Sequence, residues 1–395
     1  MPGLPPLNHP ILPVPEKFQV ALLPHFAPPL LQATYGADIM NILLNRFRET
    51  GLPEASLAAG EICTNPGAAQ ALFAKCPVAK PTPLHSLPEL AARLGVANID
   101  IKDERTRMGL GSFKALGAAF AIAKAADATM AKNPALPVEE ALAERVFVCA
   151  SAGNHGLSLA AGAQVFGAKA VVYLSETVPA DFASRLEAKG ARVVREGAQY
   201  EASMEAAKAA AKTHGWTLLS DSSWPGYTEL PRDVMEGYLI MGAEVAAQLA
   251  TPPSHIFLQA GVGGLAAASA VAARHYWGAA PKIYVVEPDY APALLGSIKA
   301  GRPLASKGPV SGMGRLDCKE PSHLALKYLA READGFITVS EAEAASAVEG
   351  LRAQGLAASP SAVAGYAGFL CAREKLGLTA DSRVLITLTE GPVDA

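Results

Sequence analysis

Residues 145–174, RVFVCASAGNHGLSLAAGAQVFGAKAVVYL, decide the fold class of this chain. An apolar run, Arg145–Ala150, is followed by a turn, by apolar residues at helical spacing over Leu157–Val165, and by a second apolar run, Ala170–Leu174. Two short strands joined by a helix form a βαβ unit, whose strands are parallel in one sheet. The stretch therefore predicts an α/β fold.

The same alternation of short apolar runs and long alanine-rich helical patterns continues from Cys76 to the end of the chain. We expect further strands at Arg192–Glu196, His255–Gln259, Lys282–Glu287 and Arg383–Leu388. We expect further helices at Pro179–Lys189, Tyr200–His214, Leu230–Gln248, Leu265–Tyr276, Glu341–Ala353 and Ala362–Leu376. This pattern predicts two lobes, each a mostly parallel twisted sheet flanked by helices.

The expected domain boundaries follow from the change in pattern. Residues 1–105 should form an N-terminal extension and the start of a large domain, residues 106–215 a small domain, and residues 216–395 the rest of the large domain. The first 80 or so residues are rich in proline and read as an extension wrapped on the core, with one helix at Ala37–Arg48.

Composition limits the function classes. The chain has 395 residues, of which 50% are hydrophobic and 18% charged, so it can bury a large core. A net charge of -3 gives no general attraction to nucleic acid or anionic lipid, and a small-molecule site is the better expectation. The N-terminus shows no secretion signal, so we expect a cytoplasmic protein. Five widely spaced cysteines indicate neither a disulfide framework nor a zinc site, and we expect no bound metal.

Lys114 is the first candidate for chemistry. It lies in IKDERTRMGLGSFKALGAAFA (101–121), where a glycine-containing loop precedes an alanine-rich helix. Between Phe113 and Ala115 its amine should be partly desolvated, which lowers its pKa and frees it to attack an aldehyde. An ordinary helix lysine lying along apolar surface is the alternative.

A second candidate is the turn SAGNHG (151–156), which comes between a strand and a helix. Its backbone N–H groups at the helix N-terminus suit a carboxylate, and the side-chain amide of Asn154 could donate to a phenolate oxygen. Ser and Asn are also ordinary capping residues, and His155 could be a structural histidine.

The third motif, QAGVGGLAAA (259–268), follows a strand and opens a helix, so that its backbone can approach a phosphate. Gly261, Gly263 and Ala266 also fit the dinucleotide pattern G-x-G-x-x-A, with Glu287 as the ribose-binding acid. A nicotinamide-binding protein is therefore a rival interpretation, although it leaves Lys114 without a role.

Together, SFK (112–114), SAGNHG, GVGGL (261–265) and the final TEG (389–391) resemble the fold type II pyridoxal-phosphate (PLP) enzymes. Within that superfamily the chain is most similar to the diaminopropionate ammonia-lyases, and the resemblance covers roughly residues 76 to 395. Three further segments support this similarity: KDE (102–104) with Arg107, DSSWPGYTELPRDVMEGYLIMG (221–242) and VEP (286–288).

The resemblance implies a role for each motif. Lys114 would form the Schiff base with the cofactor, Asn154 would hold its phenolate oxygen, and Thr389 would face its pyridine nitrogen. A neutral hydroxyl there leaves the ring a weaker electron sink, which suits β-elimination. The backbone expected to cradle the phosphate is Gly261, Val262, Gly263 and Gly264. The turn expected to hold the substrate carboxylate is Ser151, Ala152, Gly153, Asn154 and His155.

Two departures from the family pattern concern the substrate. Ala152 replaces one of two aspartates that serve as bases, whereas Asp221, the other, is present, so the resemblance predicts a preference for L-amino acids. Arg315 and Lys319 stand where the family has glycines and could bind an extra anionic group, although exposed loop charges are the more common role of such residues.

The function that follows is PLP-dependent β-elimination from a small β-substituted L-amino acid such as 2,3-diaminopropionate, with Lys114 and Asp221 as the catalytic residues. The products would be ammonia and a 2-oxo acid. A serine, threonine or 3-hydroxy amino acid dehydratase and a β-replacement synthase remain alternatives. A homodimer is the expected assembly, with no nucleic-acid or membrane partner.

Overall fold

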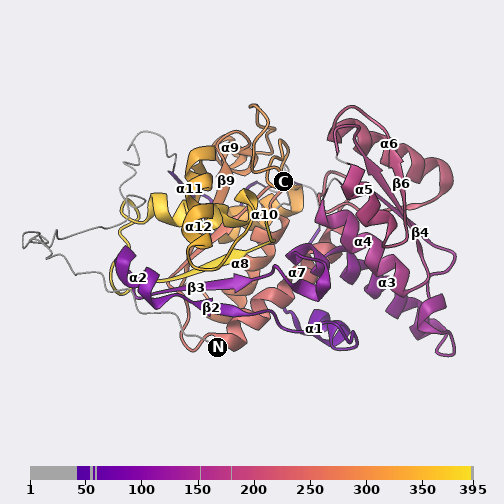
Figure 1. Ribbon diagram of the computed structural model, residues 1–395, viewed down its shortest axis with the longest axis horizontal. Coiled ribbons are helices and arrows are strands. Elements are labelled where there is room, and N and C mark those ends of the chain that lie inside the picture. The colour runs from indigo at the N-terminus through magenta and orange to yellow at the C-terminus, as the bar shows by residue number, and fades with distance from the viewer. Residues whose placement is uncertain (1–41, 54–56, 58–59, 152, 179, 393–395) are drawn as a thin grey trace, which may run out of the picture. The chain divides into compact units, whose positions relative to one another are not determined.

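The computed structural model describes residues 42–53, 57, 60–151, 153–178 and 180–392. These residues form two sheets flanked by helices (Figure 1), which confirms the predicted α/β class. All six strands predicted from the sequence are present, with ends that differ by at most one residue.

The larger sheet has seven strands, of which the five central ones are parallel and the two edge strands antiparallel to their neighbours. Its order is β1 (Ile42–Leu44), β10 (Gly335–Val339), β9 (Lys282–Pro288), β8 (His255–Gln259), β11 (Arg383–Leu388), β3 (Asn98–Asp103) and β2 (Leu84–Ser86).

Helices cover both faces of this sheet, so successive residues of its central strands pack into two different hydrophobic cores. In β8, Phe257 packs with one set of helices, whereas Ile256 and Leu258 pack with the other. This burial on both faces explains why the central strands read as continuous apolar runs. The helices on the first side are α2 (Pro88–Leu94), α11 (Glu341–Arg352) and α12 (Pro360–Ala372). Those on the second include α7 (Glu229–Gln248), α8 (Gly264–Trp277), α9 (Ala293–Ala300) and α10 (His323–Glu332).

The smaller sheet has four parallel strands, in the order β6 (Ala191–Arg195), β5 (Lys169–Leu174), β4 (Val146–Ala150) and β7 (Thr217–Leu218). Helix α6 (Tyr200–His214) covers one face. The helices on the other are α3 (Ala118–Lys132), α4 (Asn154–Val165) and α5 (Ala180–Glu187). The remaining elements are α1 (Gly67–Phe73) and the 3₁₀ turns η2 (Arg107–Gly109), η3 (Phe113–Leu116) and η4 (Val138–Glu140). The domain boundaries proposed at residues 105 and 215 stay a prediction.

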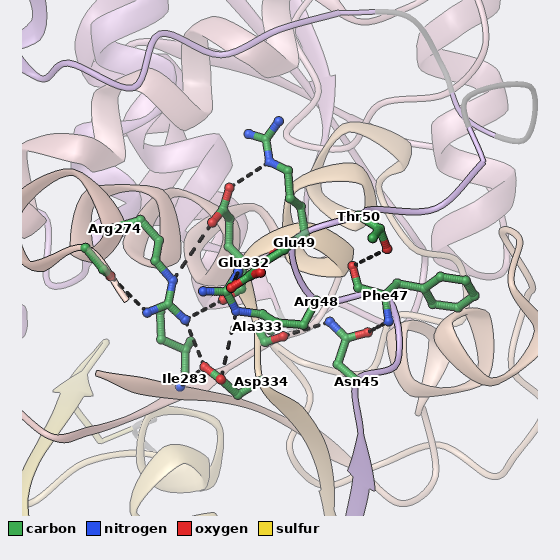
Figure 2. A network of polar contacts seen from close by, with 12 residues as sticks. Asn45, Phe47, Arg48, Glu49, Thr50, Arg274, Ile283, Glu332, Ala333 and Asp334 are labelled. Carbon is green, nitrogen blue, oxygen red and sulfur yellow. Dashed lines mark hydrogen bonds and ion pairs between the residues drawn. The ribbon is translucent and has the colours of Figure 1, made fainter. Parts of the chain in front are cut away.

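The predicted helix at Ala37–Arg48 is wrong in its described part, residues 42–48, and its first five residues lie outside the described chain. Ile42–Leu44 instead pairs with β10 as edge strand β1. The side chain of Asn45 then donates to the carbonyl oxygen of Ala330 at 2.8 Å. It also donates to the carbonyl oxygen of Ala333 at 2.7 Å (Figure 2). These contacts to the end of α10 override the helical spacing.

A buried ionic network fixes the segment that leads to Lys114. Lys102 Nζ and Arg107 Nη1 donate to opposite oxygens of the Glu244 carboxylate on α7, both at 2.7 Å. Arg107 Nη2 also donates to Glu104, at 2.7 Å. Lys102, Glu104 and Arg107 are almost fully buried. Removing one partner would leave another charge buried and unpaired, so the network holds β3 and η2 firmly against α7.

Among the described residues, no helix is both long enough and apolar enough to cross a membrane, and no group of three His, Cys, Asp or Glu side chains could hold a metal ion.

Candidate active site

Lys114 lies in the short turn η3, one turn before α3 begins at Ala118. The turn is tied to the end of β11, because Phe113 N donates to Thr389 O at 3.1 Å and Ser112 forms an isolated bridge with Glu390. The lysine is therefore positioned by the last strand of the larger sheet.

The ammonium of Lys114 donates to the carboxylate of Asp221, which follows the small sheet 107 residues later in the chain. Burial acts to lower the pKa of Lys114, but the charge of Asp221 outweighs it, and the pKa lies above its ordinary value. The expectation of a lowered pKa is thus wrong for the protein without cofactor. Burial likewise acts to raise the pKa of Asp221, and the charge of Lys114 holds it well below its ordinary value.

His155 lies close to this pair and is neutral. Burial lowers its pKa, and Nε2 lies 2.8 Å from Leu219 O, while among the described residues Nδ1 has no hydrogen-bond partner. One ring nitrogen thus holds the segment that ends in Asp221, as a structural histidine would.

The turn after β4 presents the N-terminus of α4. The Ser151 hydroxyl accepts from the N–H groups of Gly153 and Gly156, both at 3.2 Å. The first N–H groups of a helix have no intrahelical partner, so those of Asn154 and His155 are the donors that this hydroxyl leaves for a carboxylate. Ala152 lies outside the described residues.

The side chain of Asn154 is oriented by Glu390. Asn154 Nδ2 donates to Glu390 Oε2 at 2.6 Å, and Ser359 Oγ donates to Glu390 Oε1, also at 2.6 Å. An amide nitrogen carries two hydrogens, so Asn154 can donate one to Glu390 and the other to a phenolate.

A phosphate-sized cradle is formed where β8 meets α8. Gly263 has a φ of +100°, which favours glycine, and no side chain caps the helix that starts at Gly264. A Cβ atom on Gly261 would lie 2.9 Å from the sulfur of Cys318. Backbone N–H groups that no side chain caps, at a helix N-terminus, suit a phosphate, as the sequence predicts for Gly261 to Gly264.

Thr389 is buried at the end of β11, where its Oγ1 lies 3.4 Å from Gln259 Nε2. Gln259 Nε2 also donates to Ala362 O and Thr387 O, so its amide fixes the end of the strand. The Thr389 hydroxyl only accepts in its contact with Gln259, and this contact does not engage its own hydrogen. The structure thus brings Thr389 to the same strand end as Glu390, next to the turn that bears Lys114.

The two added cations have different surroundings. Lys319 Nζ donates to Tyr290 O, Pro309 O and the carboxylate of Asp317, at 2.9, 2.8 and 2.6 Å, so it cross-links its own loop. Arg315 instead reaches Glu390 with its Nε, at 3.7 Å from Oε2.

Sequence reasoning gave no role to three residues of this site. Glu390 and Ser359 join the α4 turn to the last strand, and the Tyr238 hydroxyl is buried without a hydrogen-bond partner among the described residues. The Tyr238 ring packs on Phe113, at 5.0 Å between centroids. Of these, Glu390 and Tyr238 lie inside quoted segments that assigned them no role, and only Ser359 had no local signal.

A cavity of about 230 Å³ is lined by residues 222–224, 303–305, 320, 321 and 323. Two of its lining segments follow Asp221 and Lys319 directly in the chain, but neither Asp221 nor Lys319 is part of the lining.

Residues 76–390 match the family model described as pyridoxal-phosphate-dependent enzyme. The chain belongs to this family. Its cofactor is pyridoxal phosphate, and the residues present fit it: an amine beside a carboxylate, an uncapped glycine turn at a helix N-terminus, and an amide with a second N–H. We infer that Lys114, the 261–264 cradle, Asn154 and Thr389 hold the cofactor.

Similar proteins within this PLP family are ammonia-lyases. The chain is 34% identical to a diaminopropionate ammonia-lyase of Salmonella typhimurium over 292 residues, 70% of this chain and 72% of the relative. It is 30% identical to the diaminopropionate ammonia-lyase of Escherichia coli K12 over 353 residues, 80% and 85% of the two chains. A crystal structure of the E. coli enzyme in complex with D-serine superposes with a TM-score of 0.78, at 27% identity, over 89% and 94% of the chains.

Membership of the PLP family overturns the nicotinamide interpretation, and the surroundings of Glu287 give the physical reason. Both Glu287 oxygens accept from the N–H groups of Leu294 and Leu295, at 2.7 Å each. The side chain is fully buried and caps α9, so it cannot bind a ribose.

Proposed function

We propose that this PLP enzyme eliminates the β-substituent of a small L-amino acid such as 2,3-diaminopropionate and releases ammonia and a 2-oxo acid. The observation that carries the proposal is the Lys114–Asp221 pair beside the glycine cradle of α8. The names of its relatives in Salmonella and E. coli supply the candidate substrate.

PLP, when bound, withdraws electrons from the substrate Cα and so makes its proton acidic. The protein has to position the substrate and move that proton. The N–H groups of Asn154 and His155 are placed to hold the α-carboxylate. Lys114 and Asp221 face one another, so a proton released by the amine can pass to the carboxylate and back.

Asp221 is a weak base while it faces the Lys114 ammonium, because that charge lowers its pKa. Its basicity rises once the amine loses its charge. We propose that Asp221 or Lys114 then takes the Cα proton of an L-substrate and that the β-group leaves with the released electron pair.

Loss of hydroxide instead of ammonia would make the protein a dehydratase. Matches to an L-threonine ammonia-lyase of Thermotoga maritima, 25% identical, and to an L-threo-3-hydroxyaspartate ammonia-lyase of Saccharomyces cerevisiae, 26% identical, keep this candidate open.

The test is a panel of β-substituted L- and D-amino acids incubated with the PLP-loaded protein without added nucleophile. We expect ammonia and a 2-oxo acid from L-substrates, and no product from Lys114→Ala. Lys124→Ala is a control, because Lys124 pairs with Asp233 and Glu236 on α7 and makes no contact with Asp221. Product only when a second nucleophile is supplied would establish a β-replacement synthase.

We further propose a cytoplasmic homodimer, with the small domain at residues 106–215. The family resemblance supports the dimer. Light scattering on the purified protein tests the dimer.

A further inference from the structure

The backbone of Arg315 is fixed beside the cofactor cradle. A Cβ atom on Gly261 would lie 3.1 Å from the carbonyl oxygen of Arg315, so the two backbones are in contact. Arg315 N donates to Ser361 Oγ at 3.1 Å, which ties the residue to the first turn of α12.

The side chain of Arg315 crosses from this cradle to the turn before α4. A Cβ atom on Gly153 would lie 3.4 Å from Arg315 Nη1 and 3.5 Å from Cζ. The Nε atom lies 3.7 Å from Glu390 Oε2. The guanidinium therefore covers Gly153, next to the N–H groups of Asn154 and His155.

The charge of Arg315 is suited to a ligand. Its side chain is 37% exposed, so the guanidinium is reachable from solvent while one edge meets Glu390. A guanidinium carries five N–H donors in one plane, so it can bind two carboxylates at different edges. The helix N-terminus at Asn154 provides for one substrate carboxylate, and Arg315 adds a cation beside it.

We propose that Arg315 makes the enzyme select substrates with a second carboxylate on Cβ, such as 3-hydroxyaspartate or 2,3-diaminosuccinate. Such a carboxylate is attached one carbon further along the substrate than the α-carboxylate, whose expected site is the helix N-terminus that the guanidinium adjoins. This inference rests on the proposed β-elimination and names its substrate class.

The products differ from those of the monocarboxylic substrates only by the added carboxylate. From 3-hydroxyaspartate, the Cα proton and the β-hydroxide leave as water, and one water is taken up again when ammonia is released, so that oxaloacetate and one ammonia result. From 2,3-diaminosuccinate, uptake of one water gives oxaloacetate and two ammonia molecules.

Two matched substrate pairs test the proposal, each differing only in the second carboxylate: serine against 3-hydroxyaspartate, and 2,3-diaminopropionate against 2,3-diaminosuccinate, with both Cβ epimers of the acids. We expect kcat/KM to be about 10- to 100-fold higher for the dicarboxylic member, in the range of one charge-assisted hydrogen bond. Arg315→Gly should bring both ratios to about 1.

Arg302→Gly, the same substitution at an exposed arginine after α9, should leave both ratios unchanged. Arg315→Lys should keep part of the preference, because it retains the charge without the planar fork. If Arg315 had a purely structural role, Arg315→Gly would lower kcat/KM equally for all four substrates, and that result would overturn the proposal. A wild-type preference for the monocarboxylic substrates would also overturn it.

Binding gives a readout that does not need turnover. L-aspartate has the second carboxylate but no good β-leaving group, and L-2-aminobutyrate lacks both. Calorimetry on the PLP-loaded protein should show tighter binding of L-aspartate by about 10-fold or more, lost in Arg315→Gly. Equal affinities would refute the role of Arg315. If no substrate is turned over, the proposed elimination fails, and this comparison still decides the inference.

Discussion

Replacing Asp221 by Asn should destabilise the cofactor-free protein, because it removes the negative charge that faces the Lys114 ammonium. Breaking a fully buried ion pair costs about 3–5 kcal/mol, whereas losing an exposed one costs about 0.2–1 kcal/mol. The side chains of Lys114 and Asp221 are 23% and 18% exposed, so this pair lies nearer the buried limit. We expect a loss of about 2–4 kcal/mol at pH 7.

The free energy of unfolding that is lost in Asp221→Asn has an upper limit, and this limit depends on pH. In Asp221→Asn, burial lowers the pKa of Lys114, and the amine can shed its proton. Neutralising a lysine of ordinary pKa about 10.4 costs about 5 kcal/mol at pH 7 and about 2 kcal/mol at pH 9. In the wild type, the raised pKa of Lys114 keeps its contribution constant up to about pH 10, and the lowered pKa of Asp221 keeps its contribution constant down to about pH 4. The difference between the two proteins should therefore shrink from pH 7 to pH 9.

Urea unfolding of both cofactor-free proteins at pH 7 and pH 9 measures this difference. Asp233→Asn is the matched control, because Asp233 pairs with Lys124, whose side chain is 43% exposed, and should cost at most about 1 kcal/mol. If Asp221→Asn costs no more than Asp233→Asn, or if its cost is the same at pH 7 and pH 9, the reasoning about a buried charge pair is refuted.

Three further predictions concern the loaded enzyme. Lys114→Ala should abolish turnover and the visible absorption of the lysine-bound cofactor while circular dichroism stays that of the folded protein; undiminished turnover would remove Lys114 from the mechanism. Thr389→Ala should weaken PLP binding by about 1 kcal/mol, about fivefold in Kd by fluorescence titration, since one hydrogen bond is lost. The wild type should prefer L- over D-amino acids by at least roughly a hundredfold in kcat/KM, because a positioned base contributes 10²–10⁴-fold and Ala152 supplies none. Ala152→Asp should raise the D-activity selectively, and comparable rates for both enantiomers of 2,3-diaminopropionate in the wild type would contradict this prediction.

The sequence predicts those parts of the fold whose signal is local. The strands His255–Gln259 and Arg383–Leu388 have the predicted ends, because both faces of the sheet are covered and most of their buried positions are apolar. The strands β1, β2, β3, β7 and β10 were not predicted. Of these, β1, β2 and β7 have only two or three residues, which carry too little pattern and depend on their partners in the sheet. The helical spacing around Ile42–Leu44 was outweighed by pairing with a strand about 290 residues away.

The residues of the site could likewise be predicted where their signal is local, and not where it depends on a distant part of the chain. The motifs around Lys114, Asn154 and Gly263 each have a local pattern. In the structure Lys114 contacts Asp221, and Asn154 contacts Glu390. The glycine segment 261–264 lies against the backbones of Asp221 and Arg315. The direction of the Lys114 pKa was predicted wrongly because its decisive partner, Asp221, comes 107 residues later. Nothing near Arg315 in the sequence distinguishes it from Lys319, and only the folded chain places one over Gly153 and the other within its own loop.

Glu287, which caps α9, takes up a proton when the chain folds near neutral pH. Burial raises the pKa of Glu287 to about 8, so the folded protein holds a proton there at pH 6 to 7, where an unfolded glutamate is ionised. Unfolding in that range releases the proton to the buffer, and the contribution of Glu287 to stability, complete below about pH 4, declines as the pH rises toward 8. The difference in melting heat between the wild type and Glu287→Gln should accordingly change between phosphate and an amine buffer of equal pH, by up to the difference in the ionisation enthalpies of the two buffers.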